Sequence, residues 1–251
     1  MNVDITDKVA VVTGAAQGIG RVLALGLAAE GARVAVLARD RKRAQAVVDE
    51  IGTLPDAPPA LALEADVRDE AAVREAAAEV DRAWGRVDAL INNAGWMPPR
   101  QPILEAEASL FEEVFGSNLI GSVLTTKHFA PLMIRGGGGR IIYLSSAVSV
   151  QTAPGGAAYG GSKAAVNVLA NVVHQELADD GIRTTALAPG LTVTPGMEKI
   201  VTEEHLARVA AQYPGRRIGQ PEDLVPLTVF LCSEAAEHIS GSVMFVRPPG
   251  R

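Results

Sequence analysis

Short apolar runs alternate with amphipathic stretches along almost the whole chain. Runs such as Val9–Val12 are apolar on both faces, which is typical of a parallel strand inside a sheet. The stretches between them repeat apolar residues at helical spacing, which indicates helices with one buried face. Strands are predicted at Val9–Val12, Val34–Leu37, Ala60–Glu64, Ala89–Asn92, Arg140–Leu144, Thr184–Ala188 and Val243–Val246. Helices are predicted at Gly18–Glu30, Arg41–Ile51, Glu70–Trp84, Glu112–Arg135, Ala157–Ala178 and Pro221–Ser233.

This alternation predicts an α/β fold, a Rossmann-type doubly wound parallel sheet of seven strands with helices on both faces. A chain of 251 residues that is 48% hydrophobic can bury one core of this kind. The sequence contains no obvious linker or internal repeat. We therefore expect a single domain over residues 1–251.

A glycine-rich turn joins the first predicted strand to the first predicted helix. Gly14 allows a sharp turn, and Gly18 and Gly20 lack side chains, so that backbone amides at the helix start can approach a pyrophosphate. This pattern predicts a dinucleotide site, although its glycine spacing differs from the common fingerprint. The alternative is a turn that only allows tight packing of the strand and helix.

Tyr159 and Lys163 lie one turn apart on one face of a predicted helix, and Ser146 ends the strand-like run RIIYLSS. An ammonium beside a phenol stabilises the phenolate and lowers the phenol pKa toward the range that is useful for proton transfer. A nearby hydroxyl can bond the same substrate oxygen. Alone, the pair would equally fit a half-buried aromatic and a solvated lysine.

Several motifs occur in the order that the short-chain dehydrogenase/reductase family shows, and the chain resembles that family over essentially its whole length. They are TGAAQGIG at Thr13–Gly20, Ala65 with Asp66, NNAG at Asn92–Gly95, Asn118, Ser146, Tyr159 with Lys163, and PGLTVT at Pro189–Thr194. The general pattern is similar to that of 3-oxoacyl-[acyl-carrier-protein] reductase-like members. It does not separate them from sugar, steroid or antibiotic-pathway reductases.

The resemblance implies an enzyme that transfers a hydride reversibly between a nicotinamide and a ketone or secondary alcohol. Tyr159 would be the general acid or base, and Ser146 would polarise the substrate oxygen. Lys163 would lower the Tyr159 pKa and hold the nicotinamide ribose, and Asn118 would support a proton relay behind it. Without the family pattern, Ser146 would be interpreted as a strand-end serine and Asn118 as a helix-interior amide.

The resemblance also implies a set of cofactor contacts. They are Gly14, Gln17, Gly18, Ile19, Gly20, Arg39, Asp66, Val67, Asn92, Ala94, Gly95, Tyr159, Lys163, Pro189, Gly190, Thr192 and Thr194. Asp66 would accept a hydrogen bond from the adenine amino group, and Thr194 would meet the nicotinamide amide or the phosphates. Alternatively, these two residues cap loops, and Asn92 with Asn93 ties neighbouring strand ends together.

The end of the second predicted strand, VAVLARD, bears on the choice between NADP and NAD. Ala38 stands where NAD-specific relatives carry an acid for the ribose hydroxyl. Arg39 follows, and Arg43 adds positive charge that suits a 2′-phosphate, so we expect NADP(H) rather than NAD(H). Asp40 argues the other way, because it lies about 20 residues beyond the glycines, as an NAD-type acid does. It would otherwise cap the next helix.

Residues 192–219 lie where the family carries the segment that covers the substrate, and we expect them to form a lid. The expected pocket residues are Trp96, Met97, Val148, Gln151, Gly190 and Val193. This set is mostly apolar, so that apolar or amphipathic ketones fit it better than a small dicarboxylate does. Trp96 and Met97 could instead pack beneath the lid.

Charge and composition argue against other kinds of partner and site. The net charge of −6 gives no reason to bind nucleic acid or an anionic membrane. The sequence shows neither a membrane-span-like apolar run nor a signal peptide, so a cytoplasmic location is expected. Cys232 is the only cysteine, which excludes an intrachain disulfide. No metal site is expected, because the histidines are scattered: His128, His174, His205 and His238.

The chain departs from the family pattern at its end, where Arg247, Pro248 and Pro249 replace the usual Asp-Gly-Gly stretch. The prolines remove backbone donors, which affects the local substrate-loop and subunit contacts. Relatives are commonly tetramers built on the helices around Asn118 and Tyr159. A homo-oligomer, either a tetramer or a dimer, is therefore expected.

Two alternative functions use the same fold, namely a non-catalytic nucleotide-binding regulator or scaffold and an NAD-dependent alcohol dehydrogenase. A regulator has no need of the complete set Asn118, Ser146, Tyr159 and Lys163. An epimerase or dehydratase generally needs a further substrate domain, for which this chain is too short.

Overall fold

A seven-stranded parallel sheet forms the centre of the molecule, in the strand order β3-β2-β1-β4-β5-β6-β7. The computed structural model describes residues 3–194, 202–212 and 215–247. The strands are β1 (Val9–Thr13), β2 (Arg33–Ala38), β3 (Leu61–Glu64), β4 (Ala89–Asn92), β5 (Gly139–Leu144), β6 (Ile182–Pro189) and β7 (Ser242–Val246). This confirms the predicted doubly wound sheet and each of its strands to within two residues at either end.

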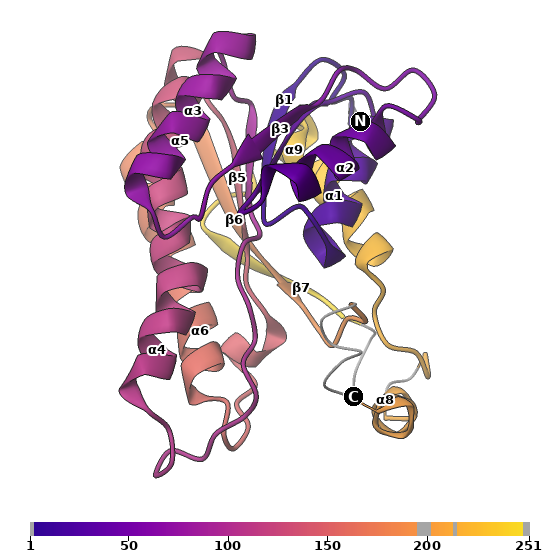
Figure 1. The fold of residues 1–251 in the computed structure, drawn as a ribbon, viewed down its shortest axis with the longest axis vertical. Helices are drawn as coiled ribbons and strands as arrows, with labels where there is room; N and C mark the ends of the chain where they lie inside the picture. Colours follow the sequence, from indigo (N-terminus) through magenta and orange to yellow (C-terminus); the bar gives the residue numbers. More distant parts are fainter. Residues whose placement is uncertain (1–2, 195–201, 213–214, 248–251) are drawn as a thin grey trace.

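Helices cover both faces of the sheet (Figure 1). One face carries α1 (Gly18–Ala29), α2 (Arg41–Ile51) and α9 (Val225–Cys232). The other carries α3 (Glu70–Trp84), α4 (Ala108–Phe115), α5 (Gly121–Arg135) and α6 (Ala157–Leu177). Shorter helical segments are η1 (Gly116–Ile120), η2 (Ala147–Ser149), α8 (Glu203–Ala210), η3 (Pro221–Leu224) and η4 (Glu234–Ala236).

The two helix layers enclose two separate apolar clusters, one on each side of the sheet. In β1, Ala10 and Val12 belong to the cluster beneath α1 and α2, whereas Val9 and Val11 belong to the cluster beneath α3, α5 and α6. Successive side chains of a strand point to opposite faces. The continuous apolar run in the sequence therefore reflects burial on both sides.

The predicted helix Glu112–Arg135 differs from the structure. It starts earlier, at Ala108, and is interrupted by the π-helical turn η1, which contains the buried Asn118. Such turns insert a residue without ending the helix, and they are frequent at functional sites. The amphipathic pattern runs on through the turn, so it did not reveal the change in helical geometry.

The last long helix also begins differently from the prediction, because Pro221–Leu224 form a 3-10 turn before α9. Pro226 has no backbone N–H for an α-helical bond to Glu222, and the carbonyl of Glu222 instead accepts from the N–H of Val225.

The chain order within the sheet reverses between β1 and β4. The connections after these two strands run in opposite directions, which leaves a crevice at their carboxyl ends. In such sheets this is the position at which ligands bind.

The start of α3 offers a test of local stability, because the Asp69 carboxylate accepts from the N–H groups of Ala71 and Ala72 at 2.9 and 3.2 Å. We expect Asp69→Ala to lower the free energy of unfolding by about 1 kcal/mol, since it leaves these donors uncapped. Asp69→Asn keeps the acceptor and should lose less. Urea denaturation measures both variants, and equal losses would contradict the capping role.

Candidate active site

A cavity of about 510 Å³ opens at the carboxyl ends of β1 to β4. The residues predicted to contact the cofactor that line it are Gly14, Gln17, Arg39, Asp66, Val67, Ala94 and Gly95. They come from the loops after four different strands, and the reversal in strand order brings these loops to one crevice. Trp96, which was expected to contact substrate, also lines this cavity.

Helix α1 begins beside this cavity without a side-chain cap. Gln17 occupies the capping position but makes no capping bond, and the first turn contains no acidic residue. Instead, Arg43 Nη2 donates to Gln17 Oε1 at 2.6 Å. Free N–H groups and the helix dipole make such a terminus suitable for an anion. Gly18 there has a φ of +56° and faces Thr194, because a Cβ atom on Gly18 would lie 3.8 Å from the Thr194 side chain.

Gly14 and Gly20 are required by contacts within the protein. A Cβ atom on Gly14 would lie 2.8 Å from Ala94 Cα, and one on Gly20 would lie 2.7 Å from the Gly14 oxygen. Gly20 is buried and lines neither of the two cavities described here, and the Ile19 side chain packs against the core. Tight packing, the alternative raised by the sequence, therefore accounts for Gly20, whereas Gly14 also lines the cavity.

Asn92 differs from its predicted role, because its side chain is turned away from the cavity. Its Oδ1 accepts from Thr125 Oγ1 at 2.6 Å, and its Nδ2 donates to Thr126 Oγ1 at 3.3 Å. Both partners belong to α5, and Asn92 is buried. Asn93 does tie strand ends together, since its Nδ2 donates to the Thr13 carbonyl at 2.8 Å. The alternative that the sequence left open therefore describes Asn93 correctly.

Charged side chains gather at the end of the cavity formed by the loops after β2 and β3. Arg39 and Arg43 line this end together with Asp40. Asp40 caps α2, because its carboxylate accepts from the N–H of Lys42 at 2.8 Å. The helix-cap interpretation of Asp40 is therefore the one that the structure shows, and the cap uses one of the carboxylate's acceptor positions.

Asp66 is already paired within the protein. Arg68 Nη2 and Nε lie 2.6 and 3.0 Å from its two carboxylate oxygens. These hydrogen bonds hold the pKa of Asp66 below its usual value. The acceptor that was expected for the adenine amino group is thus shared with a guanidinium, which the sequence reasoning did not consider. A basic residue two positions after the aspartate was the available signal.

Strand β5 and helix α6 bring Ser146, Tyr159 and Lys163 together. The Ser146 side chain lies close enough to the Tyr159 phenol to lower the pKa of that phenol. Lys163 Nζ lies 5.8 Å from the centre of the Tyr159 ring and donates to the Leu144 carbonyl at 2.6 Å. The two hydroxyl groups therefore converge, while the ammonium is directed at a backbone oxygen.

The pKa of Tyr159 shifts in the direction opposite to the prediction. Burial raises this pKa from its ordinary value of 10.0, and the nearby Ser146 side chain opposes that rise. Burial also lowers the pKa of Lys163 to about 8. The expected lowering of the Tyr159 pKa by Lys163 is absent because removal from water disfavours both charged forms.

Asn118 connects the loop after β4 to helix α6. Its Oδ1 accepts from the N–H of Trp96 at 2.9 Å, and its Nδ2 donates to Ser162 Oγ at 3.0 Å. Ser162 in turn donates to the Tyr159 carbonyl at 2.7 Å. The sequence did not single out Ser162, although it lies between Tyr159 and Lys163. Asn118 therefore positions the backbone on both sides of the crevice.

A second network, which the sequence reasoning missed, supports Ser146. Ser145 Oγ donates to Asn167 Oδ1 at 2.6 Å, and Asn167 Nδ2 donates to Ser149 Oγ at 2.9 Å. Because Ser146 lies between these two serines, the network holds it against α6. Asn167 lies two helical turns beyond Tyr159 on the same helix face, and that spacing was the available signal.

A second cavity, of about 360 Å³, is lined by the loop that follows Trp96 and by the start of α6. Met97 and Val148, which were predicted to contact substrate, line it together with Tyr159. Gln151 is exposed and lines neither cavity. The N–H of Val193 donates to the Gly219 carbonyl at 2.9 Å, and Val193 also lines neither cavity.

The segments after β6 are described in part. Gly190 follows Pro189, and the N–H of Gly190 donates to the Val246 carbonyl at 2.9 Å. Thr192 forms a β-bridge with Gly219. None of these five residues lines either cavity. Residues 195–201 and 213–214 of the predicted lid, and residues 248–251 of the predicted tail, lie outside the described residues.

The described residues include neither a cluster of side chains that could bind a metal ion nor a membrane-spanning helix. No group of three or more histidine, cysteine, aspartate or glutamate side chains could hold a metal ion there. No helix in the same ranges is both long and apolar enough to cross a membrane.

The sequence is similar to that of known oxidoreductases. The family model described as short chain dehydrogenase matches residues 8–205. An NADPH-dependent aldehyde reductase-like protein, chloroplastic, from Arabidopsis thaliana is 33% identical over 247 residues, covering 94% of this chain and 92% of that protein. A 3-oxoacyl-[acyl-carrier-protein] reductase FabG from Staphylococcus aureus is 36% identical over 240 residues, covering 95% of this chain and 96% of that protein.

Solved structures share the whole fold. A 7 alpha-hydroxysteroid dehydrogenase complexed with NADH and 7-oxo glycochenodeoxycholic acid gives a TM-score of 0.94 at 31% identity, covering 99% of this chain and 96% of that one. An L-sorbose reductase from Gluconobacter frateurii complexed with NADPH and L-sorbose gives a TM-score of 0.89 at 30% identity, covering 100% of this chain and 98% of that one.

The buried Lys163 predicts a dependence of stability on pH. Its pKa is about 8 in the folded protein and near 10.5 when exposed, so the unfolded state binds more protons between these values. The free energy of unfolding should therefore rise by about 1 kcal/mol per pH unit above pH 8, an increase that Lys163→Met should lack.

Urea denaturation between pH 7 and about 9.5 measures this slope. Lys42→Met changes an exposed lysine of α2 and should behave as the wild type does. Parallel profiles for the wild type and Lys163→Met would show that the lysine is not desolvated.

Proposed function

The chain belongs to the short-chain dehydrogenase family and is an NAD(P)-dependent oxidoreductase of alcohol or carbonyl groups, and from that premise we propose its cofactor preference and chemistry. It transfers a hydride reversibly between NADP(H) and a ketone or secondary alcohol, with Tyr159 as the general acid or base. The observation that carries this proposal is that Ser146, Tyr159 and Lys163 meet at one place, with Tyr159 lining the second cavity.

The crevice fits a dinucleotide. The uncapped start of α1 suits the pyrophosphate, and Gly14 and Gly95 line the cavity without side chains that would fill it. Gly18 and Thr194 face each other at the same helix start. When bound, the nicotinamide supplies or accepts the hydride.

Tyr159 is proposed to donate its phenol proton to the carbonyl oxygen during reduction and to remove it from the alcohol during oxidation. Burial keeps the phenol protonated, which is the form that reduction requires. Ser146 hydrogen-bonds the same substrate oxygen and orients it. Lys163, which is buried one turn beyond Tyr159, holds the ribose hydroxyls. Asn118 supports the relay that returns the proton to Tyr159.

A preference for NADP(H) is supported by the charges at the adenosine end of the crevice. Arg39 lines the cavity, and Arg43 is held there by Gln17. Asp40, the residue that favoured NAD, caps α2. The Arabidopsis thaliana relative is named as NADPH-dependent, and the L-sorbose reductase was solved with NADPH. Guanidinium groups at this position suit a 2′-phosphate.

We also propose a cytoplasmic homo-oligomer. Exposed apolar side chains on α5 and α6 support an oligomer, because contiguous apolar surface commonly marks a protein interface. These side chains are Val123, Val168 and Val172. The single-domain organisation over residues 1–251, with a lid at residues 192–219, is part of the same proposal.

Replacing the proposed acid tests the chemistry directly. We expect Tyr159→Phe to retain less than about 1% of the ketone reduction rate, because general acid catalysis contributes at least that factor. The absorbance of the reduced nicotinamide, followed with a panel of ketones, measures the rate. NADPH binding should persist in the variant. Tyr143→Phe, which changes a buried core tyrosine, is the matched control. Full activity of Tyr159→Phe would exclude the assigned role.

Replacing Arg39 tests the cofactor preference. We expect Arg39→Ala to weaken NADPH binding about tenfold while NADH binding changes little, because only NADPH carries the 2′-phosphate. Fluorescence titration of both nucleotides measures the two dissociation constants. Arg74→Ala removes an exposed arginine of α3 and should leave both unchanged. Equal losses for the two nucleotides in Arg39→Ala would count against NADP(H).

A further inference from the structure

The second cavity lies where the body of a substrate could extend away from Tyr159. It is enclosed by the loop between β4 and α4, by α4 itself and by the start of α6. Its wall is largely apolar and includes Met97, Pro98, Ile103, Leu110, Phe111 and Val148. A volume of about 360 Å³ falls within the usual range of small-molecule sites.

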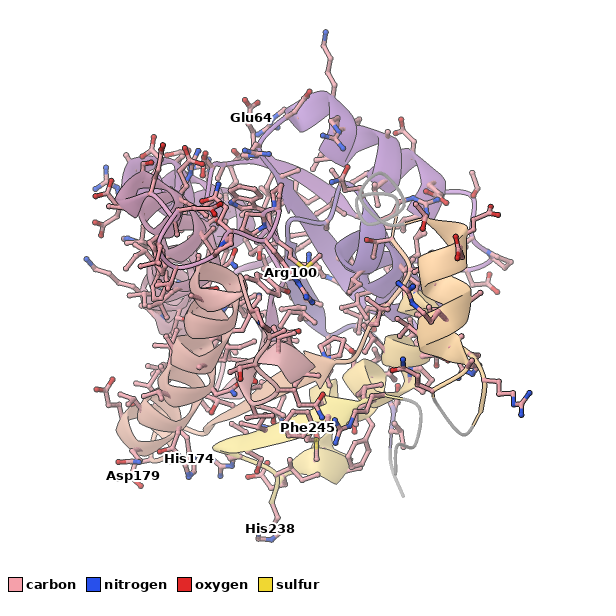
Figure 2. All side chains as sticks on the ribbon, turned by 90° about the horizontal axis from the view of Figure 1, so that it is seen from below. Glu64, Arg100, His174, Asp179, His238 and Phe245 are labelled. Carbon is pink, nitrogen blue, oxygen red and sulfur yellow. The ribbon has the colours of Figure 1, made fainter. Side chains whose placement is uncertain are left out.

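A single cation lines this cavity. Among the described residues around it, Arg100 is the only one with a charged side chain. Arg100 is exposed, and no salt bridge joins it to a carboxylate in the described parts of the chain. The view from below shows Arg100 near the middle of the molecule, whereas Asp179 and His238 lie at its edge (Figure 2).

The backbone around Arg100 is held against the segment that leads into α6. The N–H of Gln101 donates to the Gly155 carbonyl at 3.1 Å. Gly155 has a φ of +75°, and a Cβ atom there would lie 2.9 Å from Arg100 Cβ. Tyr159 follows Gly155 by four residues, in the first turn of α6. Arg100 is therefore placed beside the cavity by contacts close to the proposed acid.

The loop contains a second polar group that the protein leaves unpaired. Gln101 lines the same cavity, and its Oε1 is buried without a hydrogen-bond partner in the described structure. Buried acceptors are normally paired. An occupant that donates to this amide, directly or after a small rotation of the side chain, would satisfy it.

We propose that this cavity binds the body of the substrate, and that the substrate is a ketone or secondary alcohol whose apolar body ends in a carboxylate or another monoanion. The apolar wall buries the body, and Arg100 pairs with the anionic end in a charge-assisted hydrogen bond. This inference rests on the proposed function, because it extends the site of Tyr159.

Other substrate classes match the cavity less well. A dianion would leave one charge without a partner, since Arg100 is the single cation among the described lining residues. A polyol would bury hydroxyl groups against a wall that has few polar side chains to bond them. The phosphates of the cofactor are served by the other cavity, whose lining includes Arg39, Arg43 and Arg68.

Binding of two matched probes tests the inference without any turnover. Octanoate and octanamide have similar shapes, but only octanoate is charged. Calorimetric titration into the full chain should show tighter binding of octanoate. Arg100→Gln should weaken octanoate binding about tenfold and leave octanamide binding unchanged. Arg74→Gln, an exposed arginine of α3, should behave as the wild type does.

Saturating NADPH distinguishes the two cavities. We expect octanoate affinity to persist with NADPH bound, whereas competition would place the anion in the nucleotide crevice and overturn the inference. Undetectable binding of both probes, or equal octanoate affinity in the wild type and Arg100→Gln, would also overturn it. Octanoate binding that depends on Arg100, in a protein that reduces no ketone, would instead count against the proposed function alone.

Discussion

The structure depends on a hydrogen-bonded joint between the carboxyl ends of β1 and β4. Thr13 Oγ1 accepts from the N–H groups of Asn93 and Ala94 at 3.0 and 2.9 Å. The Asn93 side chain donates back to the Thr13 carbonyl. Here the strand order reverses, so two neighbouring parallel strands must separate without leaving buried backbone groups unpaired. The joint satisfies them and fixes the walls of the crevice. Gly14 and Gly20 are glycines largely because this joint leaves no room for a side chain.

The polar groups of the candidate active site are held in place by burial as well as by hydrogen bonds. Lys163 lies in the interior with the Leu144 carbonyl as its acceptor, and Ser146 lies beside the Tyr159 phenol. Each charged form is disfavoured there, which keeps a protonated phenol next to a readily deprotonated amine. Networks through Asn118 and Asn167 join the backbone around this pair to the loops after β4 and β5.

The distribution of charge separates two kinds of binding surface in a protein whose net charge is −6. Three arginines line the cavity at the carboxyl ends of β1 to β4, and one arginine lines the cavity beside Tyr159. Asp40, Asp66 and Glu113 also line the first of these cavities, so that its acidic and basic side chains balance, whereas Arg100 is the one charged residue in the described lining of the second. Local cations can therefore select anionic ligands within an acidic protein.

The sequence by itself determined the order of strands and helices, the parallel sheet and the common helix face of Tyr159 and Lys163, because these follow from periodicities within one segment. Only the tertiary structure decided that Asn92 bonds to α5 while Asn93 ties β4 to β1, that Asp40 is a helix cap, that Arg68 pairs with Asp66, and that burial raises the Tyr159 pKa. Side-chain orientation at a strand end and loss of water around a group depend on neighbours from other elements. Apolar spacing within one segment does not contain that information.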